Sequence, residues 1–178
     1  MLKKLNSVAA LALAVALPVY ASDASNGFNV SSSATLDHGP LPTQYTCDGK
    51  DVSPQLSWSH QPDNTQSFAL IVSDPDAPSG VFYHWVLFNI PKSVTSLEEG
   101  ISRLPSGTLV GKNSFGKQGY NGPCPPRDAT HTYVFTLYAL DASLSLSAGS
   151  DAETVLSVMQ DHVLSQAQFT TIYSRGMK

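Results

Sequence analysis

The stretch TYVFTLYAL, residues 132–140, is the strongest strand signal in the sequence and decides the fold class. It is rich in aromatic and β-branched residues, which favour the pleated surface of a β-strand. Apolar residues occupy both of its alternating faces, so we expect this strand to lie centrally, between two packed layers. A buried central strand must pair with other strands that are also rich in apolar residues.

Two neighbours of this kind precede it in the chain. SFALIVS (67–73) and HWVLFNI (84–90) are short apolar runs bounded by turn-forming residues, and their length and flanks favour buried strands over helices. GFNVSSSAT (27–35) predicts a weaker first strand, and QFTTIYS (168–174) predicts a last one. Residues 39–58 are dense in turn formers and predict irregular structure.

One helix is predicted, over SDAETVLSVMQDHVLSQ (150–166). Ser150 followed by Glu153 has the spacing of a capping box at the helix N-terminus. Because the predicted strands come first in the chain and the helix comes late, we predict a mostly β protein with antiparallel sheets and small helical additions. The apolar face of the helix is formed at helical spacing by Val155, Leu156, Met159, Val163 and Leu164.

The N-terminus has the three parts of a secretory signal. Lys3 and Lys4 form a positive region, residues 8–17 are apolar, and small residues at 19 and 21 suit cleavage after Ala21. The sequence therefore predicts a signal peptide over residues 1–21, a single domain over 22–178, and export to a bacterial periplasm or the exterior. No second hydrophobic segment follows that predicts a membrane anchor.

The charge of the chain argues against a nucleic-acid partner. The formal net charge is −4, and it falls to −6 when Lys3 and Lys4 leave with the signal. A protein that binds nucleic acid or an anionic membrane in a general way needs a basic face.

Cys47 and Cys124 are the two cysteines of the chain. An even number in an oxidising compartment predicts one disulfide, and two separate thiols are the alternative. Neither cysteine has a second cysteine or a histidine within four residues, so we expect no zinc site and no other metal.

Chemically active side chains gather at the ends of the predicted strands. Asp74, Asp76 and His84 flank two of them, while His131 and Tyr133 open the third and point to the same face because they are two residues apart. Imidazole and phenol groups are hydrogen-bond donors, so the set describes a small pocket for an anion. We expect Asp74 to accept from a pocket histidine and fix its tautomer, and Asp76 to brace a turn.

Each of these residues also has a purely structural interpretation. DPDAP (74–78) has the composition of a turn closed by aspartate side chains. His84 fits a core histidine beside Trp85, and Tyr133 fits a packing residue on a central strand. The loop before His131, residues 119–126, is rich in glycine and proline. Its backbone amides are candidates for further donors to the anion.

DPDAP, with a histidine ten residues after its first aspartate, and GPCPPRDATHTY (122–133) resemble the two signature segments of the phosphatidylethanolamine-binding protein family. YTCDGKDVSPQLSW (45–58) and GYNGPCPP (119–126) are similar to its bacterial branch, the Raf-kinase-inhibitor-like proteins of YbhB/YbcL type. The resemblance covers residues 27–174. It implies two antiparallel sheets with short flanking helices, one of them near the C-terminus, and a pocket for phosphate-like anions.

The resemblance also implies which residues form the pocket. Its lining would comprise Asp74, His84, Cys124, Pro125, His131 and Tyr133. Its rim would comprise Asp76, Pro78 and Gly122. One departure is Thr132, where the family often has a basic residue, but a strand directs that side chain away from the pocket.

Three classes of function follow from this reading. The leading one is a noncatalytic, exported binder of a small phosphorylated or anionic ligand that modulates another protein. The second is a protein-interaction or inhibitor module with a vestigial pocket, and the third is a hydrolase using the histidines and aspartates. No side chain is placed as an activated nucleophile, so we expect no catalytic residues and no cofactor. The kinase partner of eukaryotic members does not transfer to an exported bacterial protein.

Overall fold

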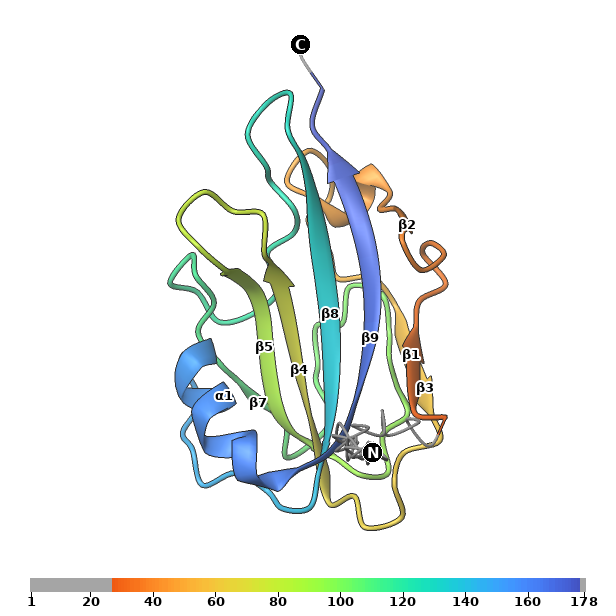
Figure 1. Cartoon of the computed structure of the whole chain (residues 1–178), viewed down its shortest axis with the longest axis vertical. Coiled ribbons are helices and arrows are strands. Elements are labelled where there is room, and N and C mark those ends of the chain that lie inside the picture. Colours follow the sequence, from red (N-terminus) through yellow and green to blue (C-terminus); the bar gives the residue numbers. More distant parts are fainter. Residues whose placement is uncertain (1–26, 177–178) are drawn as a thin grey trace, which may run out of the picture.

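The computed structural model describes residues 27–176, and the predicted signal peptide lies outside them. Two β-sheets and one short α-helix make up the fold (Figure 1). The larger sheet has the order β2-β9-β8-β4-β5-β7, with β2 (Gly39–Pro40), β4 (Ser67–Asp74), β5 (Phe82–Pro91), β7 (Leu109–Val110), β8 (Thr130–Leu140) and β9 (Val163–Ser174). The smaller sheet has the order β1-β3-β6, with β1 (Asn29–Ser31), β3 (Leu56–Ser59) and β6 (Ser96–Leu97).

The strand predicted to be central is central. β8 pairs antiparallel with β9 on one side and with β4 on the other. Tyr133, Phe135 and Leu137 are fully buried in the core that faces the smaller sheet, whereas Leu140 is buried on the opposite face. A strand with apolar residues on both faces is expected at this position.

The prediction of a mostly β fold with two antiparallel sheets is confirmed, with one local exception. β2 pairs parallel with β9, through Gly39–Thr171 and Pro40–Ile172. All other strand pairs in the described part of the chain are antiparallel. β2 is only two residues long and lies at the edge of the sheet, which is where a proline is tolerated.

The large sheet has a core on each face. β4 shows the alternation clearly, because Phe68 and Leu70 pack toward the smaller sheet while Ala69 and Ile71 pack toward the helix. The smaller sheet adds Trp58 to the first core.

The predicted helix is shorter than expected. α1 spans Ala152–Met159 and is followed by a 3-10 turn, η2 (Gln160–His162), after which the chain enters β9. Val163 and Leu164, placed on the apolar face of the helix by the sequence pattern, lie in β9 and are partly exposed. Pairing with β8 explains the difference, because the β8–β9 ladder begins at Leu140–Val163.

The capping-box prediction is also wrong. Asp151, not Ser150, caps α1, and its side chain accepts from the backbone N–H of Thr154 at 2.8 Å. Ser150 instead donates its hydroxyl to the Ser147 carbonyl at 2.8 Å. Aspartate and serine are about equally good N-caps, so the one-residue shift follows from the path of the chain.

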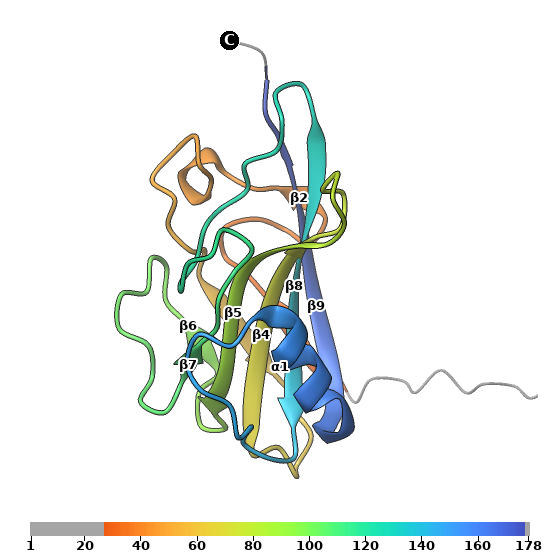
Figure 2. The same cartoon turned by 90° about the vertical axis from the view of Figure 1, so that its left-hand side faces the viewer.

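The remaining short helix is η1 (Thr43–Tyr45). Both views place the β4–β5 connection and the loop before β8 at the upper end of the long strands, away from α1 (Figure 1, Figure 2). This end carries the predicted site residues. Within residues 27–176, no helix is long and apolar enough to cross a membrane.

Candidate functional site

A cavity of about 210 Å³ lies where β4 ends and where β5 and β8 begin. Residues far apart in the sequence meet there because these three strands are adjacent in the large sheet. The cavity has a polar floor and a largely apolar wall. It is lined by Asp74, Ala77, Pro78, Ser79, Phe82, His84, Phe115, Cys124, Pro125, Pro126 and His131.

His131 is paired with Asp74 in the floor of the cavity. The distance between His131 Nδ1 and Asp74 Oδ2 is 2.7 Å, and both residues are buried. Asp74 also accepts from the backbone N–H of Asp76 through Oδ1 at 2.9 Å. An ionised carboxylate only accepts hydrogen bonds, so Nδ1 of His131 carries a proton and Nε2 is the nitrogen available to a ligand. Asp74 thus occupies the orienting position expected of it.

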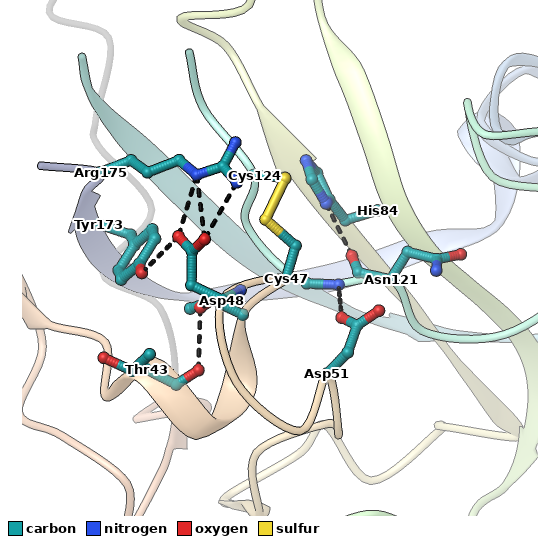
Figure 3. Close-up of a disulfide and its surroundings, with 11 residues drawn as sticks. Thr43, Cys47, Asp48, Asp51, His84, Asn121, Cys124, Tyr173 and Arg175 are labelled. Carbon is teal, nitrogen blue, oxygen red and sulfur yellow. Dashed lines mark hydrogen bonds and ion pairs between the residues drawn. A yellow bond between two sulfur atoms is a disulfide. The ribbon is translucent and has the colours of Figure 1, made fainter. Parts of the chain in front are cut away.

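His84 is held in the same manner by a different acceptor. Its Nδ1 lies 2.7 Å from the carbonyl oxygen of Asn121, and its other ring nitrogen points away from that loop (Figure 3). A carbonyl cannot donate, so Nδ1 again carries the proton. Burial is the main cause that lowers the pKa of His84 below its usual 6.5, and the neighbouring backbone carbonyl and Asp74 oppose the shift.

Tyr133, predicted to line the pocket, packs between the two histidines and is not part of the cavity lining. Its ring meets the His84 ring edge-on, with 5.3 Å between centroids, and stacks on the His131 ring at 6.5 Å. The hydroxyl of Tyr133 is buried and has no hydrogen-bond partner among residues 27–176. Burial, followed by the negative charge of Asp74, raises the pKa of Tyr133, so the phenol keeps its proton and remains a donor.

The two predicted rim residues of the β4–β5 turn have different roles. Pro78 lines the cavity. Asp76 does not; its Oδ2 accepts from the backbone N–H of Thr132 at 2.7 Å, and this bond is the main cause that lowers the pKa of the Asp76 carboxyl. Asp76 therefore ties the turn to the start of β8.

The third predicted rim residue, Gly122, lies away from the cavity lining. Its backbone N–H donates to Asp51 Oδ1 at 2.6 Å and is therefore not available to a ligand. Cys124 and Pro125 do line the cavity, as predicted, together with Pro126. The prolines have no N–H, so this loop supplies mainly a stiff apolar wall, where amide donors were expected.

Asn113 is a residue of this site that sequence reasoning missed. It is buried, and its Nδ2 donates to Asn121 Oδ1 at 2.8 Å and to the Gly119 carbonyl at 3.1 Å. Its Oδ1 accepts from the backbone N–H of Phe115 at 3.0 Å. The side chain of Asn113 thus holds Asn121, whose carbonyl fixes His84, and the backbone of Phe115 at the cavity mouth. Nothing in the polar, glycine-rich sequence around Asn113 distinguishes it from a solvated residue.

Two aromatic residues of the mouth were missed as well. The ring centroids of Phe82 and Phe115 lie 4.8 Å apart, and each lies within 5.5 Å of the His84 ring. Phe115 is 42% exposed, which is unusual for so large an apolar side chain. The mouth of the cavity is therefore apolar above a polar floor.

The predicted cysteine pair is joined beside the cavity. Cys47 and Cys124 form a disulfide, and the residue after Cys47 is fixed by an ion pair (Figure 3). Both oxygens of Asp48 accept from Arg175 at 3.0–3.1 Å, and Asp48 also accepts from the hydroxyl of Tyr173 at 2.9 Å. Hydrogen bonds from Arg175 and Tyr173 lower the pKa of Asp48.

A larger cavity, of about 350 Å³, lies between the loops near β7 and contains no histidine. Its lining includes Asp51, Trp85 and Tyr120. We assign the candidate site to the smaller cavity because two imidazoles, those of His84 and His131, share its lining. Among residues 27–176, no group of three or more histidine, cysteine, aspartate or glutamate side chains is arranged to hold a metal ion.

Comparison with known proteins gives a consistent result. The sequence model of the family described as phosphatidylethanolamine-binding protein matches residues 31–174. A UPF0098 protein of Methanothermobacter thermautotrophicus is 49% identical over 151 residues, covering 83% of this chain and 99% of the relative. A UPF0098 protein of Aquifex aeolicus is 45% identical over 139 residues, covering 76% of this chain and 81% of the relative.

Two solved structures share the fold over nearly their whole length. The Chlamydia trachomatis homologue CT736 has a TM-score of 0.79 at 37% sequence identity, and the match covers 85% of this chain and 99% of that one. Escherichia coli YbcL has a TM-score of 0.80 at 33% identity, with the same coverage of both chains.

Proposed function

This chain belongs to the phosphatidylethanolamine-binding protein family, and we propose that its cavity binds a small anionic group such as a phosphate ester. One observation carries the proposal: His84 and His131 line one cavity with Nδ1 of each engaged by a protein acceptor. Each ring then has only Nε2 left for a ligand. Tyr133 packs against both imidazole rings but does not line the cavity, so the two histidines are the proposed donors.

Anion binding at this site requires protons. A neutral histidine whose Nδ1 carries the proton presents Nε2 as an acceptor, so it donates to an anion only after it becomes an imidazolium. At His84, burial disfavours that charged form. The lining contains neither lysine nor arginine. The anion is therefore expected to bind together with a proton.

The remainder of the ligand is expected to be apolar. Phe82 and Phe115 flank the mouth, and prolines 78, 125 and 126 complete the wall. A ligand that carries its anionic group on an aliphatic or aromatic body would satisfy the floor and the mouth together. In this proposal the protein binds the ligand and releases it unchanged.

Export from the cytoplasm is part of the proposal and rests on residues 1–21 alone. The relatives include an archaeal protein, so the fold itself does not imply a periplasmic location. That this chain modulates a partner protein remains a prediction. The alternative is an interaction module with a vestigial pocket, and the exposed side chain of Phe115 at the mouth favours it. It predicts a partner that is retained when the pocket is mutated.

Sulfate affinity is expected to fall as pH rises from about 5 to 8. Sulfate does not titrate in this range, so its binding reports histidine protonation. Because sulfate raises the pKa of a nearby imidazole, affinity is greatest below the free-state pKa and is lost between the free and bound values. The free-state pKa of His84 is already below 6.5, so affinity continues to increase below that pH, by at most about tenfold per pH unit for each proton.

NMR titration of the imidazole resonances provides the measurement, because it works at millimolar affinity and reports each histidine separately. His84→Gln keeps a donor but removes a titrating charge, and should flatten the profile, as should His131→Gln. His162→Gln is the matched control, since that histidine pairs with Asp141 on the surface at 2.9 Å. Sulfate affinity that does not change with pH would contradict the proposal.

A further inference from the structure

The disulfide is a solvent-exposed part of the cavity wall. Cys47 and Cys124 are both exposed, and Cys124 lines the cavity. Disulfides that are exposed are the ones open to thiol attack, whereas those that serve structure alone resist it. This bond therefore combines two properties: access from solvent and contact with the proposed binding site.

Few hydrogen bonds hold the wall segment, residues 122–126, although Gly122, Pro123 and Pro125 are buried. Three of its residues are prolines and donate no backbone hydrogen bond. The segment is held at its start by the bond from the Gly122 N–H to Asp51 and by the Pro123 carbonyl, which accepts from the Cys47 N–H at 3.1 Å. Beyond Cys124, the Pro126 carbonyl accepts from the Ala129 N–H at 3.1 Å.

The other half of the disulfide is firmly anchored. Asp48, next to Cys47, is bound by Arg175 (Figure 3). The backbone of Arg175 also exchanges hydrogen bonds with Asp128 and Ala129 at the base of the same loop. The disulfide is thus the covalent link between a fixed point and the exposed part of a wall segment that is packed at Gly122, Pro123 and Pro125 but makes few hydrogen bonds after Pro123. Cleaving it is expected to free the wall and leave the β-sheet core intact.

We propose that the Cys47–Cys124 disulfide is a site of exchange with low-molecular-weight thiols, and that its redox state sets the affinity of the cavity for anions. The proposal rests on the anion-binding function proposed above. A thiolate attacks one sulfur and forms a mixed disulfide, and the other cysteine leaves as a thiolate that takes up a proton. A second thiol then releases the first as its own disulfide, so two thiols are oxidised while the protein disulfide is reduced to two cysteine thiols.

Binding and redox state are coupled in both directions. If reduction weakens anion binding by some factor, a saturating anion must shift the reduction equilibrium by the same factor toward the disulfide. We expect a factor of about ten or more, which corresponds to re-ordering about one residue of backbone on binding. A tenfold change is equivalent to about 30 mV for this two-electron couple.

The first measurement compares sulfate binding before and after reduction with dithiothreitol, at one pH near 5.5, by NMR of the histidine resonances. Oxidised dithiothreitol at the same concentration is the control for the reagent itself. We expect at least about tenfold weaker sulfate binding in the reduced protein, with dispersed core resonances showing that it remains folded. The double variant Cys47→Ser/Cys124→Ser should bind as weakly as the reduced protein and should not respond to dithiothreitol.

The second measurement follows reduction of the folded protein by glutathione, with mass spectrometry detecting the mixed disulfide. Saturating sulfate should shift the equilibrium toward the disulfide by the same factor found in binding. Equal sulfate affinity in both redox states, or a disulfide that glutathione cannot open in the folded protein, overturns the inference and leaves the proposed function standing. An oxidised protein that fails to bind sulfate overturns the proposed function and this inference with it.

Discussion

Replacing Asp74 with alanine is expected to lower the free energy of unfolding by about 3 kcal/mol, because it removes the acceptor of a buried carboxylate–imidazole hydrogen bond. Asp74 is 4% exposed and His131 is 7% exposed, so water cannot replace the lost carboxylate. The substitution also leaves the N–H of Asp76 without its acceptor. This is a large share of the stability of a typical domain, and chemical denaturation at neutral pH measures it.

Asp141→Ala is the matched control. Asp141 accepts from Nδ1 of His162 at 2.9 Å, which is nearly the distance in the buried pair, but both side chains are more than 40% exposed. We expect a loss of less than about 1 kcal/mol, as for other surface ion pairs. Equal costs for the two substitutions would show that burial of the Asp74–His131 pair does not govern its contribution.

Asp74→Asn separates the orienting role of the carboxylate from its repulsion of an anion. Asparagine has nearly the same shape but no charge, and its amide can either donate or accept, so it no longer requires the proton on Nδ1 of His131. If the carboxylate serves to orient and charge the histidine, sulfate binding should weaken, which is the result we expect. If Asp74 only repels the anion, the same substitution should tighten binding.

The sequence predicted the fold well where the apolar pattern has a single interpretation. Residues 132–140 and 67–73 are apolar on both faces, and only a central strand of a covered sheet buries both. The end of the helix was less predictable. Val163 and Leu164 fit the helical spacing of the preceding residues, but the free edge of β8 pairs with this segment, and no local pattern reports that competition.

The candidate site was predictable in its titratable residues and not in their supports. Aspartates and histidines next to apolar strands are visible in the sequence, because they are costly there unless paired. The hydrogen-bond partners that support these residues cannot be identified from the sequence. Asp51, which accepts from the N–H of Gly122, lies 71 residues away in the sequence. The five hydrogen bonds of the Asn113 side chain depend on the path of a loop without periodicity.

Gly122→Ala is the second substitution with a large expected effect, of about 3 kcal/mol in the free energy of unfolding, because it forces an extra carbon into a closed space. A Cβ at this position would overlap the carbonyl oxygen of Tyr45 and would lie 2.8 Å from Asp51 Oδ1 and 2.9 Å from Thr46 Cα. These contacts involve mainly backbone, which cannot move aside as a flexible side chain can. Thermal or chemical denaturation gives the magnitude.

The effect should extend from stability to the cavity. Gly122 follows Asn121, whose carbonyl holds Nδ1 of His84, so a displaced backbone at 122 moves the acceptor that fixes this histidine. We therefore expect weaker sulfate binding and a changed His84 resonance in whatever fraction of Gly122→Ala remains folded. Gly176→Ala is the control, since nothing lies within 4 Å of its added carbon. A Gly122→Ala protein as stable as the parent, with an unchanged His84 resonance, would show that the loop does not need this close approach, and that His84 is positioned by its aromatic neighbours instead.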